Sequence, residues 1–379
     1  MAERPGPAIP ISQPQLGPAV EALVLQVLRS GRLAQGPLVE RFEELCRRMA
    51  GAGHAVAVAN GTVSLEAALE VLGVGPGDEV VTSPLTFAAT LNAILRAGAT
   101  ARFADVAPDG TIDPAAAADL VGRRTATLLP VHLYGLPADM PALAALAASA
   151  GLGLVEDAAQ AHGAAVAGRP VGSFGLGSFS FYATKNVTSG EGGVVTCQDA
   201  ATATRLRLLR NQGMAERYRY ELVGRNLRLT ELQAAVAIPQ LERLEVLAAR
   251  RAANAALLDE LLAADGRAAR LPLPAGRRHA WHQYTVLLPG GADRDAVVAA
   301  LARAGVQAGV YYPRLVWDHP VYRDRPGVVA DPTPAAAGIA SRCLSLPVHP
   351  GCSQADLEQV AAALRAALDT APAASARPR

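Results

Sequence analysis

The sequence predicts an α/β protein: a large domain whose mostly parallel sheet carries helices on both faces, then a smaller C-terminal α/β domain. Short apolar runs alternate with segments of helical periodicity between residues 54 and 157, and this order is typical of parallel sheets. The 379 residues exceed what one small core supports. The pattern changes again after the LPLPAG turn at 271–276, where the smaller domain is expected to begin.

The first half of the chain supplies the expected sheet and its helices. Two helices are predicted at about 18–30 and 38–50. A strand at 54–59 is followed by the turn Asn60-Gly61-Thr62 and a helix that ends at Gly73. The remaining elements alternate: strands at 77–83, 101–106 and 152–157, a strand and loop at 125–135, and helices at 88–97, 114–122 and 139–150.

The second half is less regular. Gly-rich strands around residue 185 could turn antiparallel, and a long helical region at 230–264 should kink at Pro239. Beyond it we expect strands at 279–289, 305–313 and 343–348, and helices at 293–304 and 353–370. The predicted parts are an extended N-terminal arm at 1–16, a large domain at 17–269, a small domain at 270–371 and a disordered tail at 372–379.

Charge and cysteine content narrow the class of protein. The formal net charge is +1, and no basic stripe points to nucleic acid or an anionic membrane. No run approaches the ~18 apolar residues of a membrane span. The four cysteines form no C-x-x-C pair and have no His at zinc spacing, so no metal site is expected. Scattered free thiols suggest a cytoplasmic protein.

Lys185 is the most informative residue. Of the 35 basic residues, 34 are arginine and Lys185 is the single lysine. Arginine cannot give up its proton at working pH, whereas a lysine can be tuned to do so. A retained lysine therefore suggests a neutral amine for a Schiff base, most often with pyridoxal phosphate (PLP). The ordinary explanation is a loop lysine left by chance.

PLP also needs an anion for its pyridine nitrogen. Asp157 ends the apolar strand LVED, at the carboxyl edge of the sheet where α/β proteins bind ligands. Taken alone, an acid after a strand is as often a helix N-cap or a turn residue. The lysine 28 residues later favours the functional explanation.

Five further residues could complete a PLP site. Gly61 and Thr62 open a helix, whose N-terminal amides can hold a phosphate, and Ser180 could be a second phosphate donor. Phe87 follows a strand at the same edge and could stack on the ring. Gln160 could donate to the phenolic oxygen of the ring. Each also has an ordinary explanation: a capped helix start, a strand serine, a core phenylalanine and a polar loop residue.

Several longer motifs carry a resemblance over nearly the whole chain. They are NGTVSLEAALEVLGVGPGDEVVTSPLTFAAT, VEDAAQAHGA, SFSFYATKNVTSGEGGVVT, GRNLRLTELQAAVAIPQLERL and SLPVHP. With these motifs the sequence resembles the DegT/DnrJ/EryC1/StrS family of PLP-dependent sugar aminotransferases, which have the fold-type I aminotransferase architecture. The resemblance implies that the large domain binds PLP, with Lys185 as the Schiff-base lysine and Asp157 as the pyridinium partner.

The resemblance assigns the other matched positions too. Gly61, Thr62, Ser180, Phe87 and Gln160 take the cofactor contacts considered above. It further implies that Asn226, in GRNLR, reaches the phosphate in the neighbouring subunit of a homodimer with shared sites, and that Arg228 lies near the nucleotide of the substrate.

Substrate contacts are less well defined by the sequence. Many relatives have a His before the Tyr-Pro of the small domain, whereas this chain has Tyr311-Tyr312-Pro313, and Tyr311 and Tyr312 are candidate substrate contacts. His162, close in sequence to Asp157 and Gln160, is the one histidine expected to line the site.

The implied reaction is amino transfer from L-glutamate to a nucleotide-linked keto-sugar. The Arg- and Ala-rich composition is typical of GC-rich coding and fits amino-sugar synthesis for an antibiotic or other secondary metabolite. A keto-cyclitol acceptor and a PLP-binding regulator without catalysis remain alternatives. A PLP lyase or desulfurase would need a catalytic Cys on a mobile loop, a setting that none of these cysteines has. Lys185 argues against the dehydratases of the family, which replace this lysine by histidine.

Overall fold

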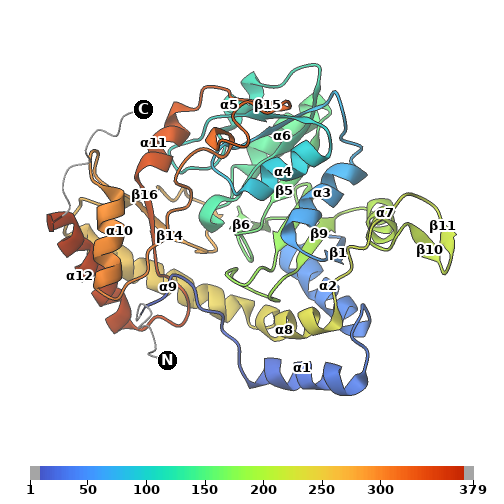
Figure 1. Ribbon diagram of the computed structural model, residues 1–379, viewed down its shortest axis with the longest axis horizontal. Coiled ribbons are helices and arrows are strands. Elements are labelled where there is room, and N and C mark those ends of the chain that lie inside the picture. Colours follow the sequence, from blue (N-terminus) through green and yellow to red (C-terminus); the bar gives the residue numbers. More distant parts are fainter. Residues whose placement is uncertain (1–8, 371–379) are drawn as a thin grey trace.

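The computed structural model describes residues 9–370 and has the predicted α/β class, with an eight-stranded sheet at its centre (Figure 1). Residues 1–8 of the predicted arm and the whole predicted tail at 372–379 lie outside the described residues. The strands follow the spatial order β1 (His54–Val58), β9 (Gly193–Cys197), β8 (Leu176–Ser180), β5 (Gly153–Asp157), β4 (Thr125–Leu129), β2 (Glu79–Thr82), β3 (Thr100–Phe103) and β15 (Val328–Val329).

Only β9 runs against the other strands of this sheet. It pairs antiparallel with β1 and with β8, while the remaining neighbours pair parallel. The carboxyl ends of all strands but β9 therefore lie at one edge, which is where open α/β sheets bind ligands.

Helices cover both faces of the sheet, as predicted. Val80 packs with Leu91 on one face and its neighbour Val81 with Leu143 on the other, because successive strand side chains alternate in direction. The first face carries α3 (Gly61–Val71), α4 (Ala88–Arg96) and α7 (Ala200–Arg210). The second carries α2 (Pro37–Ala50), α5 (Pro114–Asp119), α6 (Met140–Ala150) and α8 (Glu231–Leu241). α1 (Pro18–Ser30) lies alongside α8 (Figure 1).

A second, smaller sheet has the order β12 (Ala269–Arg270), β14 (Tyr284–Leu287), β16 (Cys343–Leu346). It packs with α9 (Leu244–Ala263), α10 (Arg294–Arg303) and α12 (Gln354–Thr370), and α11 (Pro334–Arg342) leads into β16. The same core takes in Leu258 of α9 and Ile9 of the arm. The boundary near residue 270 stays a prediction, since this core includes residues on both sides of it.

Two sequence expectations differ from the structure. The strand expected at 305–313 is wrong: Val306 and Gly309 form only isolated bridges, to Ile9 and Ser345. The chain there starts from Gly305 at φ 76° and soon meets Pro313, which interrupts a ladder. The long helix at 230–264 breaks between α8 and α9, a few residues after Pro239.

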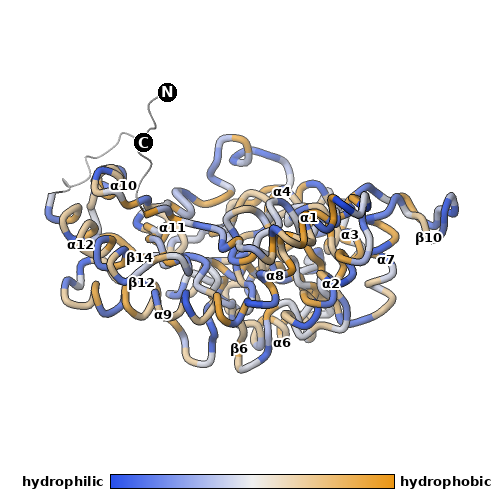
Figure 2. Tube along the Cα trace, turned by 90° about the horizontal axis from the view of Figure 1, so that it is seen from below, coloured by the Kyte–Doolittle hydropathy of each residue, from blue (hydrophilic) through white to orange (hydrophobic). Residues whose placement is uncertain are grey.

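The remaining elements are short. They are β6 (Ala165–Val166), β7 (Arg169–Pro170) and β13 (Arg277–Arg278), which form a small sheet, the hairpin β10 (Met214–Glu216) and β11 (Arg219–Tyr220), and the 3-10 turns Leu133–Gly135 and Val316–Asp318. The hairpin projects at the end of the molecule opposite α10 and α12 (Figures 1 and 2). Among residues 9–370, no helix combines the length and apolar character needed to cross a membrane.

Candidate active site

Lys185 lies in the loop that joins β8 to β9, at the ligand-binding edge of the sheet. Its side chain is partly exposed. Surrounding protein desolvates the ammonium group and lowers the pKa of Lys185 to about 8, although the carboxylate of Asp157 acts in the opposite direction. The structure therefore brings together the predicted amine and the predicted anion, and burial makes the amine easier to deprotonate than an ordinary lysine.

The Lys185 loop is anchored on both sides. Ser12 of the arm donates from Oγ to the carbonyl of Thr184 at 3.2 Å. Asn186 donates from Nδ2 to the carbonyl of Ala280 at 2.8 Å, and its Oδ1 lies 3.1 Å from Nδ1 of His282. Burial lowers the pKa of His282, so a neutral ring donates here. Sequence reasoning missed these anchors, because they come from distant segments.

Asp157 is the last residue of β5 and is buried. Its Oδ2 accepts a hydrogen bond from Oγ1 of Thr90 at 2.7 Å, and its Oδ1 accepts one from the amide of Ala159 at 3.2 Å. Thr90 was not predicted. The available signal was its position three residues after Phe87, which places both residues at the start of one helix.

Glu156, next to Asp157, points to the opposite face of the sheet, where its hydrogen bonds fix the end of β5. Its fully buried carboxylate accepts hydrogen bonds from the amides of Gly172, Phe174 and Gly175 at 2.8–3.2 Å. The fourth donor is Nε2 of His132 at 3.2 Å, because Nδ1 of this ring accepts from the amide of Ala138.

We expect Glu156→Gln to lower the free energy of unfolding by about 2–3 kcal/mol, because hydrogen bonds to a buried charge are lost and an NH₂ group faces other donors. Urea titration would measure this loss. A stability equal to that of the wild type would contradict the assigned role.

The predicted phosphate residues lie together. α3 begins at Gly61, and the side chain of Asn60 caps it by accepting from the amide of Val63 at 3.0 Å. The amides of Gly61 and Thr62 come first in the helix, where no intrahelical acceptor exists. A Cβ on Gly61 would lie only 2.5 Å from Cβ of Ser180, so the absence of a side chain lets these two segments touch.

Phe87 and Gln160 meet a third predicted residue, Tyr312. The ring of Phe87 is 61% exposed, and its centroid lies 6.3 Å from that of Tyr312. Nε2 of Gln160 donates to the hydroxyl of Tyr312 at 3.1 Å, while its Oε1 accepts from the amide of Tyr134 at 2.6 Å. Burial raises the pKa of Tyr312, which keeps its hydroxyl protonated. Tyr134, which sequence reasoning missed, also bonds through its hydroxyl to the carbonyl of Tyr311.

His162 is buried rather than open to the site. It is 1% exposed, its ring packs edge-on against Phe181 at 4.8 Å, and its two ring nitrogens have no hydrogen-bond partner among the described residues. Burial lowers the pKa of His162 to about 3, with a smaller contribution from Lys185. A substrate would reach this ring only if the packing opened, so its substrate contact stays a prediction.

Asn226 and Arg228 make their contacts elsewhere in the chain. Asn226 is exposed and forms an isolated bridge with Asn211, and Arg228 donates from Nη1 to Oδ1 of Asn211 at 2.7 Å. Their roles at a neighbouring subunit's site stay predictions.

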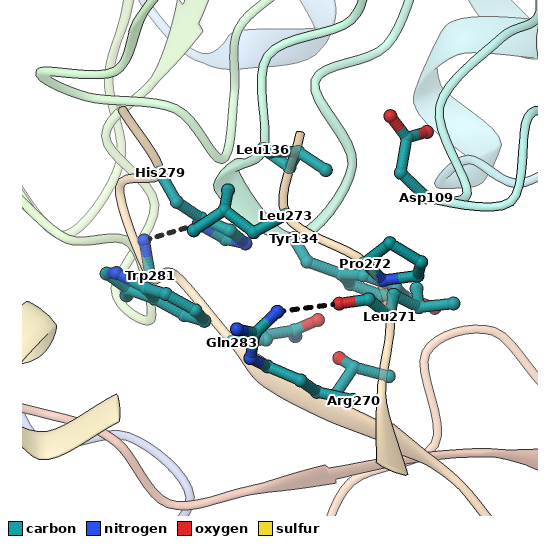
Figure 3. A pocket seen from close by; sticks show the side chains of 11 residues that line it. Asp109, Tyr134, Leu136, Arg270, Leu271, Pro272, Leu273, His279, Trp281 and Gln283 are labelled. Atoms are coloured by element: carbon teal, nitrogen blue, oxygen red, sulfur yellow. Dashed lines mark hydrogen bonds between the residues drawn. The ribbon is translucent and has the colours of Figure 1, made fainter. Parts of the chain in front are cut away.

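Tyr134 also lines a small cavity of about 20 Å³ (Figure 3). Asp109, Arg270, Trp281 and Gln283 are among the residues around it. Its volume is close to that of one or two water molecules. It is therefore too small for a cofactor.

The sheet and this edge define a fold-type I enzyme, and comparison with known proteins gives the family. The model of the DegT/DnrJ/EryC1/StrS aminotransferase family matches residues 14–365. The chain belongs to this family and is a PLP-dependent aminotransferase, as the sequence motifs predicted.

Two curated relatives and one solved structure illustrate the similarity. EryC1 of Saccharopolyspora erythraea, an erythromycin biosynthesis sensory transduction protein, is 41% identical over 90% of this chain and 93% of its own. The UDP-N-acetyl-3-dehydro-α-D-glucosamine 3-aminotransferase of Acidithiobacillus ferrooxidans is 39% identical over 84% of this chain and 86% of its own. DesV of S. venezuelae, solved in complex with a ketimine intermediate, is 38% identical with a TM-score of 0.87, covering 92% of this chain and 94% of its own.

Proposed function

We propose that this aminotransferase moves an amino group from L-glutamate to a nucleotide-linked keto-sugar. The observation that carries the proposal is the single lysine of the chain, with a pKa lowered to about 8, beside the buried carboxylate of Asp157. The acceptor class is supported by the relative named for a UDP-linked 3-dehydro sugar. The name of EryC1 supports a role in making a secondary metabolite.

The residues around Lys185 fit PLP by their chemistry. Asp157 offers an anion, the start of α3 and Ser180 offer phosphate donors, and Phe87 offers an exposed aromatic face. Gln160 and Tyr312 add hydrogen-bond donors nearby. PLP, when bound, supplies an electron sink that stabilises the carbanion of the amino donor.

Lys185 would then carry the proton in both half-reactions. Its neutral Nζ takes a proton from Cα of the donor, and later it returns a proton to the sugar carbon that receives nitrogen. A general base performs best when its pKa is near the working pH, and a pKa of about 8 meets this requirement. The carboxylate of Asp157 would provide the negative charge for the ring nitrogen.

We expect Gly61→Ala to weaken PLP binding by about tenfold or more, because the new methyl group would push α3 away from Ser180. Titration of the apoenzyme with PLP, followed by absorbance, measures the dissociation constant. Gly75→Ala is the matched control, since a Cβ there meets nothing within 4 Å. Equal PLP affinity of the two variants would remove Gly61 from the phosphate site.

We further propose a homodimer in which Asn226 and Arg228 reach the neighbouring site, Asn226 at the phosphate and Arg228 near the nucleotide. Leu25 and Leu28 of α1 and Val223 beside the hairpin are 47%, 52% and 92% exposed, and such apolar groups would be covered by a second copy. The side chain of Asn226 is free to face that copy.

Mixing two inactive variants tests this arrangement. A dimer of one Lys185→Arg chain and one Asn226→Ala chain would have one doubly altered site and one intact site. Random mixing should therefore restore about a quarter of the wild-type activity. If Asn226 serves the site of its own chain, no activity returns. Sedimentation of the mixture would check that dimers form.

The acceptor is tested with a panel of nucleotide-linked keto-sugars and keto-inositols, each assayed for glutamate-dependent amination. Turnover of a keto-sugar supports the proposal, whereas turnover of keto-inositols alone favours the cyclitol alternative. A PLP-binding regulator, an alternative consistent with the name of EryC1, would bind PLP but show no spectral change with glutamate.

The free thiols of all four cysteines support a cytoplasmic location.

A further inference from the structure

We propose that Thr90 is a positioning residue that holds the carboxylate of Asp157 in its working orientation, with Thr86 supporting it from behind. Oγ1 of Thr90 lies 2.7 Å from Oδ2 of Asp157 and 2.6 Å from Oγ1 of Thr86. This inference rests on the proposed function, in which Asp157 is the anion for the ring nitrogen of PLP.

The chemistry of the three groups sets the direction of every hydrogen bond. An ionised carboxylate only accepts, so the single hydroxyl proton of Thr90 points to Asp157. Thr90 must therefore accept in its bond with Thr86, and Thr86 is the donor. The result is a one-way chain of hydrogen bonds that ends on the negative charge.

Because all three side chains are buried, the loss of one of these hydrogen bonds should be costly. Thr86, Thr90 and Asp157 are 3%, 0% and 6% exposed, so water cannot readily replace a lost donor. In a medium of low dielectric constant each bond polarises the next, and an unmatched charge is costly. The carboxylate has one other donor in the described residues, the amide of Ala159 at 3.2 Å, and that bond holds the other oxygen.

The two donors together define how the carboxylate plane lies. Without Thr90, only Oδ1 would be held, and the group could turn about its Cβ–Cγ bond. The start of α4 thus supplies two groups to the site. Phe87, just before the helix, would contact the face of the PLP ring, and Thr90 would hold Asp157, the partner of the ring nitrogen.

The experiment compares PLP dissociation constants of the apoenzyme for Thr90→Val, Thr90→Ser, Thr86→Val and Asp157→Asn, together with the visible spectrum of each PLP-loaded protein. Thr90→Val should weaken PLP binding about tenfold or more, because valine keeps the shape of threonine and removes the donor. Thr90→Ser, which keeps the hydroxyl, should restore affinity to within about threefold. Thr86→Val should have a smaller effect of the same sign.

A double variant separates positioning from simple packing. If Thr90 acts through Asp157, Thr90→Val should add less than about twofold in the Asp157→Asn background. Loss of the same size in both backgrounds would overturn the inference, as would wild-type affinity and spectrum in Thr90→Val. Should Thr90→Val fail to fold, as judged by thermal melting of the apoenzyme, Thr86→Val in both backgrounds gives the same test.

The role of Asp157 and the role of Thr90 can be disproved separately. Unchanged PLP affinity and spectrum in Asp157→Asn would overturn both the role of Asp157 and that of Thr90. A large effect of Asp157→Asn with no effect of Thr90→Val would overturn only the role of Thr90.

Discussion

Lys185→Arg should abolish transamination, with a loss of at least about 10³-fold in kcat. Arginine keeps the length and charge of the side chain, but it cannot release its proton and cannot hold an aldehyde. The PLP-loaded wild type should absorb near the edge of the visible range, and the variant should not. Rapid mixing with glutamate would measure the half-reaction directly and separate it from sugar binding.

The composition of the chain gives this prediction an unusually clean readout. Lys185 is the only lysine, so borohydride reduction of the PLP-loaded wild type should label one lysine-containing peptide and no other. Arg48→Lys is a matched control, because it adds a lysine at a side chain that is 62% exposed. That second lysine should remain unlabelled and activity should be unchanged. Turnover or a retained visible band in Lys185→Arg would refute the assignment.

Much of the fold was predictable because its signals are local. Alternation of apolar strands and amphipathic helices between residues 54 and 157 follows the real elements closely, since each parallel strand is buried by the helices beside it. β15 was not predictable: two residues, 328–329, extend the large sheet from a distant part of the chain. The failed strand at 305–313 contains strand-forming residues, but its neighbours offer only single bridges.

The candidate site residues also divide into those that local sequence marks and those that only distant contacts mark. Lys185 could be found from composition, and Asp157 and Gly61 from their places after strands, because those places are set by local sequence. Thr90 had only its position after Phe87 as a local signal and Tyr134 had none, since their importance arises from contacts with Asp157 and Gln160, 67 and 26 residues away. The partner residue Asn226 was reached only through family resemblance, because nothing near it in the chain marks a ligand.

Asp157→Asn should reduce kcat by about 10²–10³-fold while leaving the fold intact. Asparagine has the same shape, but it carries no negative charge and cannot keep the ring nitrogen protonated. The proton on that nitrogen is what lets the ring take up carbanion charge. The loss should therefore appear in the half-reaction with glutamate as well as in overall turnover, and PLP should bind more weakly.

Glu156→Gln is the control for this prediction, because it makes the same chemical change at the adjacent residue. Glu156 and Asp157 point to opposite faces of β5, one toward the amides around Gly172 and one toward Thr90. Glu156→Gln should lower the denaturation midpoint yet retain PLP affinity and the half-reaction rate at ligand saturation. Asp157→Asn should show the reverse pattern. If both variants lost stability and PLP affinity together, Asp157 would be a structural acid, and the electrostatic role assigned to it here would be wrong.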